Sequence, residues 1–304
     1  MQVIGIGDFG EEEESSNLKR CIQVIHRIQQ PKNVLIGLGD NFYPNGIDVY
    51  MDEESFQKVR SFFLYKKKTH TNKIRNILFL MKQYLRRHTE KFRKLRGRMH
   101  MILGNHDYYS NHSDRLELFL HRKENQFKWY MKNKWYNFVR TYNGFKIEFI
   151  AIDTNVESLS KDEMQKQKSF LQNILLIKKK CHYRIIFGHH PLFSNGQHGN
   201  ATGALRKFYE FIIKLGRIDI IMSGHDHDKQ ILQRKIFKQT IIQIVSGSSC
   251  RSRPINILAQ KRKGDIFTAT YGFIELLLRK SSFVINIWNN NNKIEFSKNI
   301  LKIN

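Results

Sequence analysis

Five short segments rich in metal-binding side chains are spaced along the chain, and each follows a run of apolar residues. The last, Gly224-His225-Asp226-His227, places two histidines one residue apart after the run that ends at Met222. In an open α/β sheet, active sites form at the carboxyl ends of the strands, where such segments meet. One metal site assembled from distant parts of the chain explains all five segments. The other four are Gly7-Asp8-Phe9-Gly10, Gly39-Asp40-Asn41-Phe42-Tyr43, Gly104-Asn105-His106-Asp107 and Gly188-His189-His190-Pro191.

The apolar runs are short and rich in isoleucine and valine, which is typical of buried strands. Between them lie segments with apolar residues at three- and four-residue spacing, which indicates amphipathic helices. This alternation predicts an α/β architecture. The expected strands are Val3–Ile6, Val34–Leu38, Met99–Leu103, Ile147–Ile152, Arg184–Phe187 and Ile218–Met222. The expected helices are Asn17–Gln29, Ser55–Tyr65, Glu163–Ile177 and Ala201–Leu215.

The tail of the chain has a different pattern, because strand-like runs follow one another there without helices between them. These runs are Ile241–Val245, Phe273–Leu278 and Phe283–Trp288, and we expect them to form a second, more antiparallel sheet. An α/β sandwich of two sheets accommodates both halves. The sequence shows neither an internal repeat nor an inter-domain linker, so we expect one domain over residues 1–304.

The charge is far from neutral, since 52 Lys or Arg face 27 Asp or Glu and give a formal charge of +25. Such a charge implies attraction to polyanions, phosphorylated surfaces or anionic lipid, but it does not define the fold. No apolar run reaches the roughly 18–20 residues that a transmembrane helix needs. The cysteines Cys21, Cys181 and Cys250 form no CxxC pair, which argues against a zinc ribbon and a disulfide scaffold and leaves one disulfide open.

The N-terminus carries no signal peptide, because the apolar segment Val3–Ile6 follows Met1 at once and Asp8 already belongs to a motif. The sequence as it stands is therefore expected to be cytoplasmic, unless a leader lies outside it.

The stretch at about 56–98 is strongly basic, with fifteen Lys or Arg and one acid, Glu90. Within it, Ile74, Ile77, Leu78, Met81 and Leu85 form one apolar helical face. We interpret the stretch as a basic helical insert packed on the domain. Two roles stay open: a solvated surface, and a docking patch for an anionic macromolecule.

The donors in the five segments are carboxylate, amide, phenolate and imidazole, without a thiolate. This set suits iron, zinc or manganese rather than a cysteine-bound structural zinc. A single ion needs about three or four ligands, whereas the segments offer seven or more. Two ions roughly 3.5–4 Å apart, bridged by a carboxylate, use the donors better and suit phosphoryl transfer to water.

Other polar residues have no comparable context. We expect Glu11–Glu14 to charge the start of the next helix, and Asp153 to be a turn residue or to support a ligand. Seven histidines are expected to be surface or packing residues: His26, His70, His88, His100, His112, His121 and His182.

The five motifs together resemble those of the calcineurin-like metallophosphoesterases, in particular the purple acid phosphatase branch of the small, tartrate-resistant type. The run Gly39–Tyr43 is similar to the one in which a tyrosinate binds ferric iron and produces the purple colour. The segments Ile152–Thr154, Gly188–Asn200 and Ser246-Gly247 are also similar, so that the resemblance covers nearly the whole chain. It implies a four-layer α/β/β/α sandwich of two mixed sheets flanked by helices.

The resemblance also implies a role for each motif residue. Asp40 would bridge two metal ions. Ferric iron would be completed by Asp8, Tyr43 and His227. A divalent ion, Zn²⁺, Mn²⁺ or Fe²⁺, would be completed by Asn105, His189 and His225. The phosphate would contact His106, which would also protonate the leaving alcohol, and His198.

The sequence departs from the family pattern at several positions. Phe9 stands where the family has Trp, Tyr108 where histidine is frequent, and Gln197 where an acid or histidine precedes the second phosphate contact. The basic insert has no counterpart that we can assign. The family is usually secreted or lysosomal, and the leader that this requires is missing here.

The resemblance implies an acid phosphatase that hydrolyses phosphomonoesters through a metal-bound hydroxide, on a small-molecule or phosphoprotein substrate. The alternatives within the superfamily are a phosphodiesterase or nuclease, for which the basic charge is favourable, and a phosphoprotein phosphatase. A third alternative is a non-catalytic scaffold that keeps the fold. The physiological substrate, the second metal and the oligomeric state do not follow from the sequence.

Overall fold

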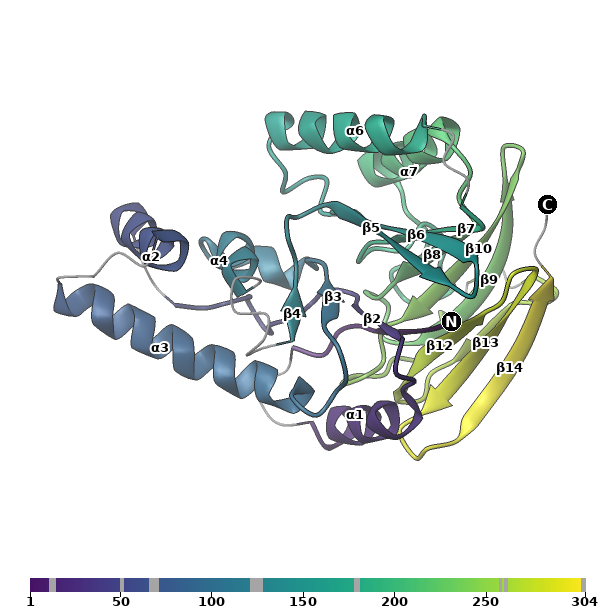
Figure 1. Ribbon diagram of the computed structural model, residues 1–304, viewed down its shortest axis with the longest axis horizontal. Coiled ribbons are helices and arrows are strands. Elements are labelled where there is room, and N and C mark those ends of the chain that lie inside the picture. Colours follow the sequence, from purple (N-terminus) through teal and green to yellow (C-terminus); the bar gives the residue numbers. More distant parts are fainter. Residues whose placement is uncertain are drawn as a thin grey trace.

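Two β-sheets lie face to face, with helices on both outer sides, in the computed structural model of the chain (Figure 1). The structure describes residues 1–10, 15–49, 52–65, 71–120, 128–177, 181–256, 259 and 262–301. The layers confirm the expected four-layer α/β/β/α sandwich.

The first sheet has the strand order β14-β13-β12-β1-β2-β3-β4 within the described part of the chain. Strands β1 to β4 are parallel, whereas β12, β13 and β14 continue the sheet beyond β1 in antiparallel pairs. The strands are β1 Gln2–Ile6, β2 Val34–Gly37, β3 Met99–Met101, β4 Trp129–Tyr130, β12 Gly272–Leu278, β13 Ser282–Asn289 and β14 Ile294–Leu301.

The second sheet has the order β11-β9-β10-β8-β7-β6-β5 over the same described residues. Its centre, β10-β8-β7-β6, is parallel, and its two ends are antiparallel. The strands are β5 Tyr136–Tyr142, β6 Phe145–Ala151, β7 Tyr183–Phe187, β8 Ile220–Ser223, β9 Lys229–Ile236, β10 Gln239–Ser246 and β11 Ile266–Thr268.

The expected grouping of the tail strands into a sheet of their own is wrong. Ile241–Val245 lies in β10, which pairs in parallel with β8 of the second sheet. Phe273–Leu278 and Phe283–Trp288 lie in β12 and β13 of the first sheet, where β12 pairs with the free edge of β1. Local periodicity defines a strand but not its partner, because pairing depends on contacts between distant parts of the chain.

Helices cover the outer face of each sheet. Helix α1 packs beside β12 of the first sheet, and α6 and α7 lie together over the second (Figure 1). Their ends follow local rules: Ser15 accepts a hydrogen bond at the start of α1, and Ser160 with Glu163 forms a capping box at α6. The bounds are α1 Ser16–Ile28, α6 Lys161–Leu175 and α7 Gly203–Leu215.

Alternate residues of the second sheet fill two different cores. Phe149 and Ile185 join the large cluster between the sheets, whereas their neighbours Ile150 and Ile186 pack under α6 and α7. This two-sided burial follows from the alternation of side chains along a strand. It also explains why these strands are continuous apolar runs.

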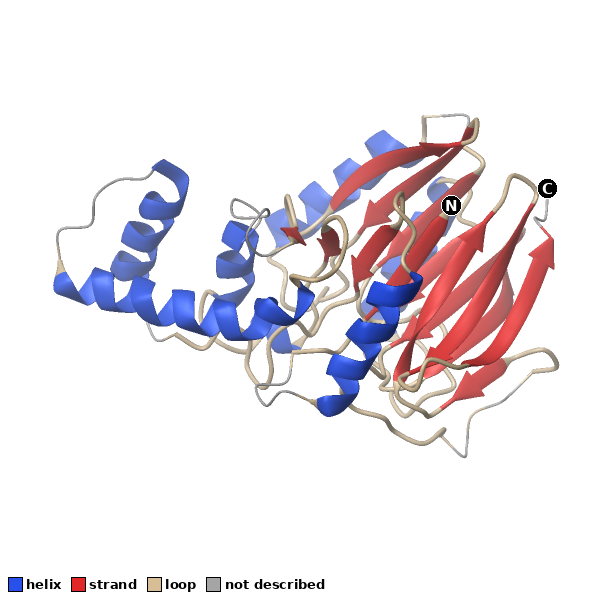
Figure 2. Cartoon of the chain, turned by 60° about the horizontal axis from the view of Figure 1, so that its bottom comes forward, coloured by secondary structure: helices blue, strands red, loops and turns tan. Residues whose placement is uncertain are grey.

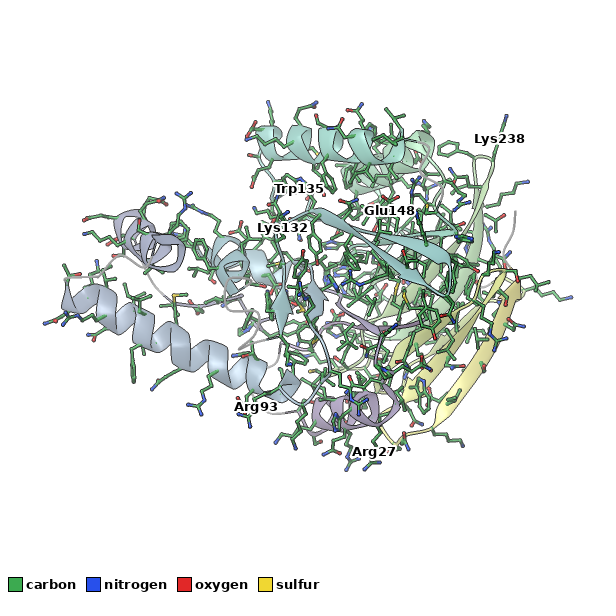
Figure 3. All side chains as sticks on the ribbon, in the orientation of Figure 1. Arg27, Arg93, Lys132, Trp135, Glu148 and Lys238 are labelled. Atoms are coloured by element: carbon green, nitrogen blue, oxygen red, sulfur yellow. The ribbon has the colours of Figure 1, made fainter. Side chains whose placement is uncertain are left out.

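The basic insert consists mainly of helices that project from one end of the sandwich, at the left of Figures 1 and 2. The predicted apolar face of α3 is buried at Ile74, Ile77, Leu78 and Met81, and the side chain of Leu85 lies outside the described set. Arg93 follows α3 and η1, at the end of the insert nearest the sandwich, and it is exposed and labelled in Figure 3. The helices are α2 Glu53–Tyr65, α3 Asn72–Thr89, η1 Glu90–Phe92 and, beside them, α4 Ser113–Leu120. Whether the insert and the sandwich form one domain stays a prediction.

Several elements escaped the sequence analysis. Helix α4 and strands β4, β5, β9, β11 and β14 lie where no strong periodicity was found. None of the helices in the described part of the chain has the length and apolar character needed to cross a membrane. No disulfide joins Cys21, Cys181 or Cys250, all of which the structure describes.

Candidate metal centre

All five donor segments follow the carboxyl ends of parallel strands and meet at one place. Asp8 follows β1, Asp40 follows β2 and Asn105 follows β3 of the first sheet, while His189 follows β7 and His225 follows β8 of the second. The two sheets thus contribute to a common site, as expected for an α/β fold.

The first set of donors contains mostly oxygen, and we call it the oxygen-rich group. The phenol oxygen of Tyr43 lies 2.7 Å from Oδ2 of Asp40, 3.4 Å from Oδ1 of Asp8 and 3.3 Å from Nε2 of His227. Nε2 of His227 lies 3.5 Å from Oδ1 of Asp8. The members of the oxygen-rich group are Asp8, Asp40, Tyr43 and His227, and all four side chains are buried.

The second set contains two imidazoles and one amide, and we call it the imidazole group. Oδ1 of Asn105 lies 3.1 Å from Nε2 of His189 and 3.1 Å from Nδ1 of His225, and these two ring nitrogens are 3.2 Å apart. The members of the imidazole group are Asn105, His189 and His225. Three donor atoms at mutual distances this short surround a single point.

Asp40 connects the two groups. While Oδ2 of its carboxylate faces Tyr43, Oδ1 lies 3.3 Å from Nε2 of His189 and accepts a hydrogen bond from the backbone of His106 at 3.0 Å. One carboxylate therefore presents an oxygen to each group.

The backbone at three of these residues is left-handed, with φ of +57° at Asp8, +53° at Asp40 and +68° at His225. Non-glycine residues rarely adopt this conformation, and it concentrates where function requires a particular orientation. Gly104 lies against Asp40 so closely that an added Cβ would stand 2.1 Å from Oδ1. The motif glycine thus allows the approach of two strand ends.

The electrostatics of the oxygen-rich group fit a bound cation. Burial raises the pKa of Asp8 well above its usual range, and the charge of Asp40 adds to this. Burial and the carboxylates of Asp8 and Asp40 also raise the pKa of Tyr43. At Asp40 burial acts in the same sense, but His189, His106 and the hydrogen bond from Tyr43 outweigh it and lower the pKa. A bound metal ion would stabilise the negative charges of Asp8 and Tyr43, which burial disfavours.

Surrounding groups orient the donors. Nδ1 of His189 lies 2.8 Å from the carbonyl oxygen of Leu38, which leaves Nε2 for a metal. The buried carboxylate of Asp107 accepts hydrogen bonds from the backbone of Asn41 at 2.9 Å and of Gly104 at 2.7 Å. Asp107 therefore fixes the loops after β2 and β3 relative to each other.

The two predicted phosphate contacts lie at the rim of the centre. Nδ1 of His106 is 2.5 Å from the carbonyl oxygen of Pro44, so that it donates a proton there, and Nε2 lies 4.0 Å from Oδ2 of Asp40. His198 is exposed, and its ring lies 4.2 Å from that of His225. Burial lowers the pKa of His198; Asp226 opposes this shift and Arg253 adds to it.

Two arginines beside these histidines were not predicted from the sequence. Nη1 of Arg253 lies 2.8 Å from Nε2 of His198, and the guanidinium of Arg251 lies 5.0 Å from the ring centre of Tyr43. Both follow β10, whose carboxyl end lies at the same edge as that of β8. The strand-end rule did not locate them, because Ile241–Val245 was expected in an antiparallel sheet, whereas it pairs in parallel with β8.

A pocket of about 320 Å³ opens beside the centre. Its walls include Asn105, His198 and His225 from the centre, and His190, whose Nδ1 lies 2.8 Å from the hydroxyl of Thr154. From this pocket a substrate can reach Asn105 and His225 of the imidazole group and the rim histidine His198.

Phe9 and Tyr108, at which the sequence departs from the family pattern, make packing or hydrogen-bond contacts. Tyr108 donates a hydrogen bond to the buried Asp153, and Phe9 packs edge-on against Phe92. Gln197 is exposed. Of the five other histidines that the structure describes, three are buried: His88, His100 and His112. The segment Glu11–Glu14 and the histidines His70 and His121 lie outside the described residues.

The family of the chain follows from comparison with known proteins. The model of the calcineurin-like phosphoesterase family matches residues 1–229. The chain therefore belongs to the calcineurin-like phosphoesterase family, in agreement with its sandwich fold and with the donor segments at its strand ends.

Two curated relatives are acid phosphatases by name. Tartrate-resistant acid phosphatase type 5 of Oryctolagus cuniculus is 21% identical over 259 residues, which cover 77% of this chain and 69% of that enzyme. Purple acid phosphatase 4 of Arabidopsis thaliana is 25% identical over 259 residues, which cover 80% of this chain and 66% of that enzyme. The chain thus spans about two thirds of the length of these relatives.

Solved structures show the same fold at low identity. GAP50, described as the anchor in the inner membrane complex of Plasmodium, matches with a TM-score of 0.72 and 17% identity over 100% of this chain and 89% of its own. The purple acid phosphatase PPD1 from seeds of yellow lupin, Lupinus luteus, matches with a TM-score of 0.59 and 14% identity over 99% of this chain and 53% of its own.

Proposed function

We propose that the protein is an acid phosphatase that hydrolyses phosphomonoesters at a centre of two metal ions. One ion is ferric iron and the other is Zn²⁺, Mn²⁺ or Fe²⁺. The observation that carries the proposal is Asp40, whose two carboxylate oxygens face two separate groups of donors. Family membership supports phosphoester hydrolysis, and the acid phosphatase relatives support the monoester class.

The donor set supports two different ions. The oxygen-rich group, with its phenol and two carboxylates, suits a hard trivalent ion such as ferric iron. The imidazole group, with Oδ1 of Asp40, suits a borderline divalent ion. When bound, such ions lower the pKa of water and stabilise negative charge on phosphoryl oxygens.

The rim histidine His106 supplies the proton for the leaving group. At acidic pH a histidine carries protons on both ring nitrogens. The carbonyl of Pro44 holds Nδ1, so that Nε2 is the nitrogen that faces the centre and the substrate. Water attacks the phosphorus, the ester P–O bond breaks, and the leaving alcohol takes its proton from Nε2 of His106.

Metal analysis combined with an absorption spectrum is the test. We expect the purified protein to contain about two metal ions per chain, at least one of them iron, with a visible band from tyrosinate bound to iron. The same preparation should hydrolyse 4-nitrophenyl phosphate faster than the bis-ester. A colourless, iron-free and active protein would contradict the assignment to the purple branch while leaving a phosphoesterase.

Preference for the bis-ester, or nuclease activity that falls steeply with salt, would instead favour a phosphodiesterase or nuclease. Preference for a phosphorylated protein over every small monoester would favour a phosphoprotein phosphatase. Both alternatives use the same centre, so the choice of substrate decides between them.

A second candidate function is a non-catalytic anchor. It is motivated by the likeness over the full chain to the Plasmodium protein, whose description names it an anchor. A scaffold that has lost catalysis has no reason to keep a full set of metal ligands. The seven candidate ligands are present here and lie together, which supports hydrolysis.

The basic insert supports a further role in substrate binding. We propose that it binds an anionic macromolecule, because its helices project from the sandwich (Figure 2) and carry exposed cationic side chains. The outer face of α3 presents Arg75 and Arg86 with Phe79 and Leu80, which are 59% and 53% exposed, between them. Charged and apolar contacts are thus available on one surface.

A further inference from the structure

A second pocket, which we call the β9 pocket, has a volume of about 600 Å³ and lies between the end of β9, the first turn of α7 and the segment 193–200. Arg234 lines it five strand residues beyond Lys229, roughly 17 Å along β9 from the end of the strand that adjoins the metal centre. The described residues that line this pocket include none of the seven predicted metal ligands. The β9 pocket is therefore separate from the donor groups.

Four cationic side chains line the β9 pocket, and no Asp or Glu stands among its described lining residues. The four are Arg206, Arg234, Lys235 and Arg262. Two of them, Arg234 and Arg206, pair with carboxylates outside the lining, those of Asp265 and Glu210. Lys235 and Arg262 are exposed and add positive charge without a carboxylate in the described lining. A pocket with this balance of charge attracts an anion.

Arg234 is a preformed part of the pocket wall. Its Nη1 and Nη2 donate to the two carboxylate oxygens of Asp265 at 2.6 Å and 2.7 Å, and Nη1 also donates to the carbonyl oxygen of Gln233 at 3.0 Å. The side chains of Arg234 and Asp265 are only 7% and 4% exposed. Because a guanidinium has five N–H groups, two remain for a ligand beyond these three contacts.

Arg206 reaches the pocket from the first turn of α7. Its Nε donates to Glu210 at 2.8 Å, one turn later in the helix, and its guanidinium lies 5.3 Å from the ring centre of Phe193. These contacts hold the guanidinium in place, which lowers the conformational entropy that it loses when a ligand binds. The Nη groups of an arginine match the geometry of phosphate oxygens.

Amide side chains form another part of the lining. Asn195 is buried and its amide nitrogen donates to Asp265 at 3.1 Å, while Oδ1 of Asn200 accepts a hydrogen bond from the backbone of Ser194 at 2.9 Å. The amide oxygen of Asn195 and the amide nitrogen of Asn200 are thus suited to bind the hydroxyl groups of a ligand. A volume of about 600 Å³ is in the range of pockets that enclose a small molecule.

We propose that the β9 pocket binds a sugar phosphate at a site separate from the metal centre. The phosphate contacts Arg206, Lys235 and Arg262, and the sugar hydroxyls contact the amides of Asn195 and Asn200. A phosphate monoester carries up to about two negative charges, which match the charges of Lys235 and Arg262. The inference concerns binding alone and does not depend on hydrolysis at the metal centre.

Calorimetric titration of the metal-loaded protein with the phosphonate analogue of glucose 6-phosphate tests the pocket. The protein cannot hydrolyse this probe as an ester, because a carbon replaces the ester oxygen. The double variant Lys235→Gln/Arg262→Gln should bind one probe molecule fewer per chain than the wild type, or bind that molecule at least about tenfold more weakly, the effect of roughly one hydrogen bond to a charged group. Identical titrations of the two proteins would overturn the proposal.

Lys207→Gln/Lys238→Gln is the matched control, because it removes the same charge at two exposed positions that do not line the pocket. Lys207 follows Arg206 in α7, and Lys238 lies at the turn after β9 (Figure 3). We expect this variant to bind the probe like the wild type. An equal loss of binding in both double variants would show that net charge, and not the pocket, attracts the probe.

Competition identifies which part of the probe the pocket recognises. Inorganic phosphate should displace the probe from the pocket, whereas glucose should not, and displacement by glucose alone would contradict recognition of a phosphate. The result is also independent of the proposed function. If the protein hydrolyses no phosphomonoester, that function fails, while a difference of one probe molecule between the wild type and Lys235→Gln/Arg262→Gln still supports the pocket.

Discussion

The phenol oxygen of Tyr43 lies 2.7 Å from Oδ2 of Asp40, three residues earlier on the same loop. The other oxygen of Asp40 lies 3.3 Å from His189, which belongs to the opposite sheet. One loop after β2 therefore connects both donor groups, with the phenol on one side of the carboxylate and the imidazole on the other.

Tyr43→Phe tests whether the phenol is a ligand. The variant keeps the ring but removes the oxygen near Asp8, Asp40 and His227, so we expect the visible absorption band to disappear. Hydrolysis should fall by about tenfold without being lost, because the other ligands remain. Spectra and kcat of the two proteins, recorded at equal iron content, provide the comparison. A band that survives in the variant would exclude Tyr43 as its source.

Asp40→Asn tests the link between the two groups. The amide keeps the shape of the side chain but removes the negative charge and presents only one good acceptor oxygen. We expect loss of both metal ions and a fall in activity of more than about a hundredfold. Metal analysis after gel filtration is the measurement. Retention of two ions with full occupancy would contradict a bridging role.

The sequence predicted the positions of the site residues better than the way in which they meet. Motifs at the ends of apolar runs located Asp8, Asp40, Asn105, His189 and His225, because a parallel α/β sheet gathers its strand ends at one edge. The left-handed backbone at Asp8, Asp40 and His225 was not predicted from the residue types at these positions. It is imposed by the tertiary structure, which overrides local preference.

Long-range pairing limited the prediction of the fold. The runs Phe273–Leu278 and Phe283–Trp288 were correctly interpreted as strands. The first lies beside β1, a partner more than two hundred residues away in the chain, and the second pairs with the first, so their place in the sheet depends on this long-range contact. The loop with Arg251 and Arg253 was missed for a related reason. Neither arginine belongs to a motif, and only the parallel pairing of β10 with β8 brings them to the centre.

Gly104→Ala tests the close approach of two strand ends. The added Cβ would stand 2.1 Å from Oδ1 of Asp40 and 2.3 Å from its backbone nitrogen, so the bridging carboxylate must move. We expect metal affinity to fall by about 10- to 100-fold, as when a supporting group is lost. Gly144→Ala is the control, because its Cβ meets nothing within 4 Å although its φ is +77°. Equal metal affinities in the two variants would show that the contact between residue 104 and Asp40 does not affect metal binding.

His100 makes stability depend on pH. Burial lowers its pKa from 6.5 to about 3, and the charges of Arg140 and Arg98 add to this; its ring stacks on Phe138 at 3.8 Å. Below pH 6.5 His100 binds a proton in the unfolded chain, whereas in the folded chain it binds this proton only near pH 3. The free energy of unfolding therefore decreases as the pH falls through this window, by about 2 kcal/mol between roughly pH 7 and pH 5.

His100→Phe should remove this contribution, because phenylalanine does not titrate and can keep the stacking on Phe138. Denaturant unfolding of wild type and variant near pH 7 and near pH 5 gives the difference. The wild type should lose about 2 kcal/mol more than the variant over this range. Identical losses in the two proteins would mean that His100 is protonated in the folded state.

The basic insert can be tested by charge neutralisation. Arg75, Arg86 and Lys94 are exposed, so Gln at all three positions lowers the charge of the arm without altering a buried contact. We expect KM for a highly phosphorylated protein to rise about tenfold at roughly 50 mM salt and less at roughly 200 mM, because salt screens exposed charges. Activity on 4-nitrophenyl phosphate should be unchanged.

A control triple variant removes the same charge from surfaces outside the insert, at the exposed residues Lys238, Lys263 and Lys280. If the insert is a docking surface, this control keeps the KM of the wild type for the phosphoprotein. If both triple variants raise KM equally, the total charge of the chain attracts the macromolecule and the insert has no particular role. The ratio of the two KM values at low salt therefore distinguishes a local docking surface from a general electrostatic attraction.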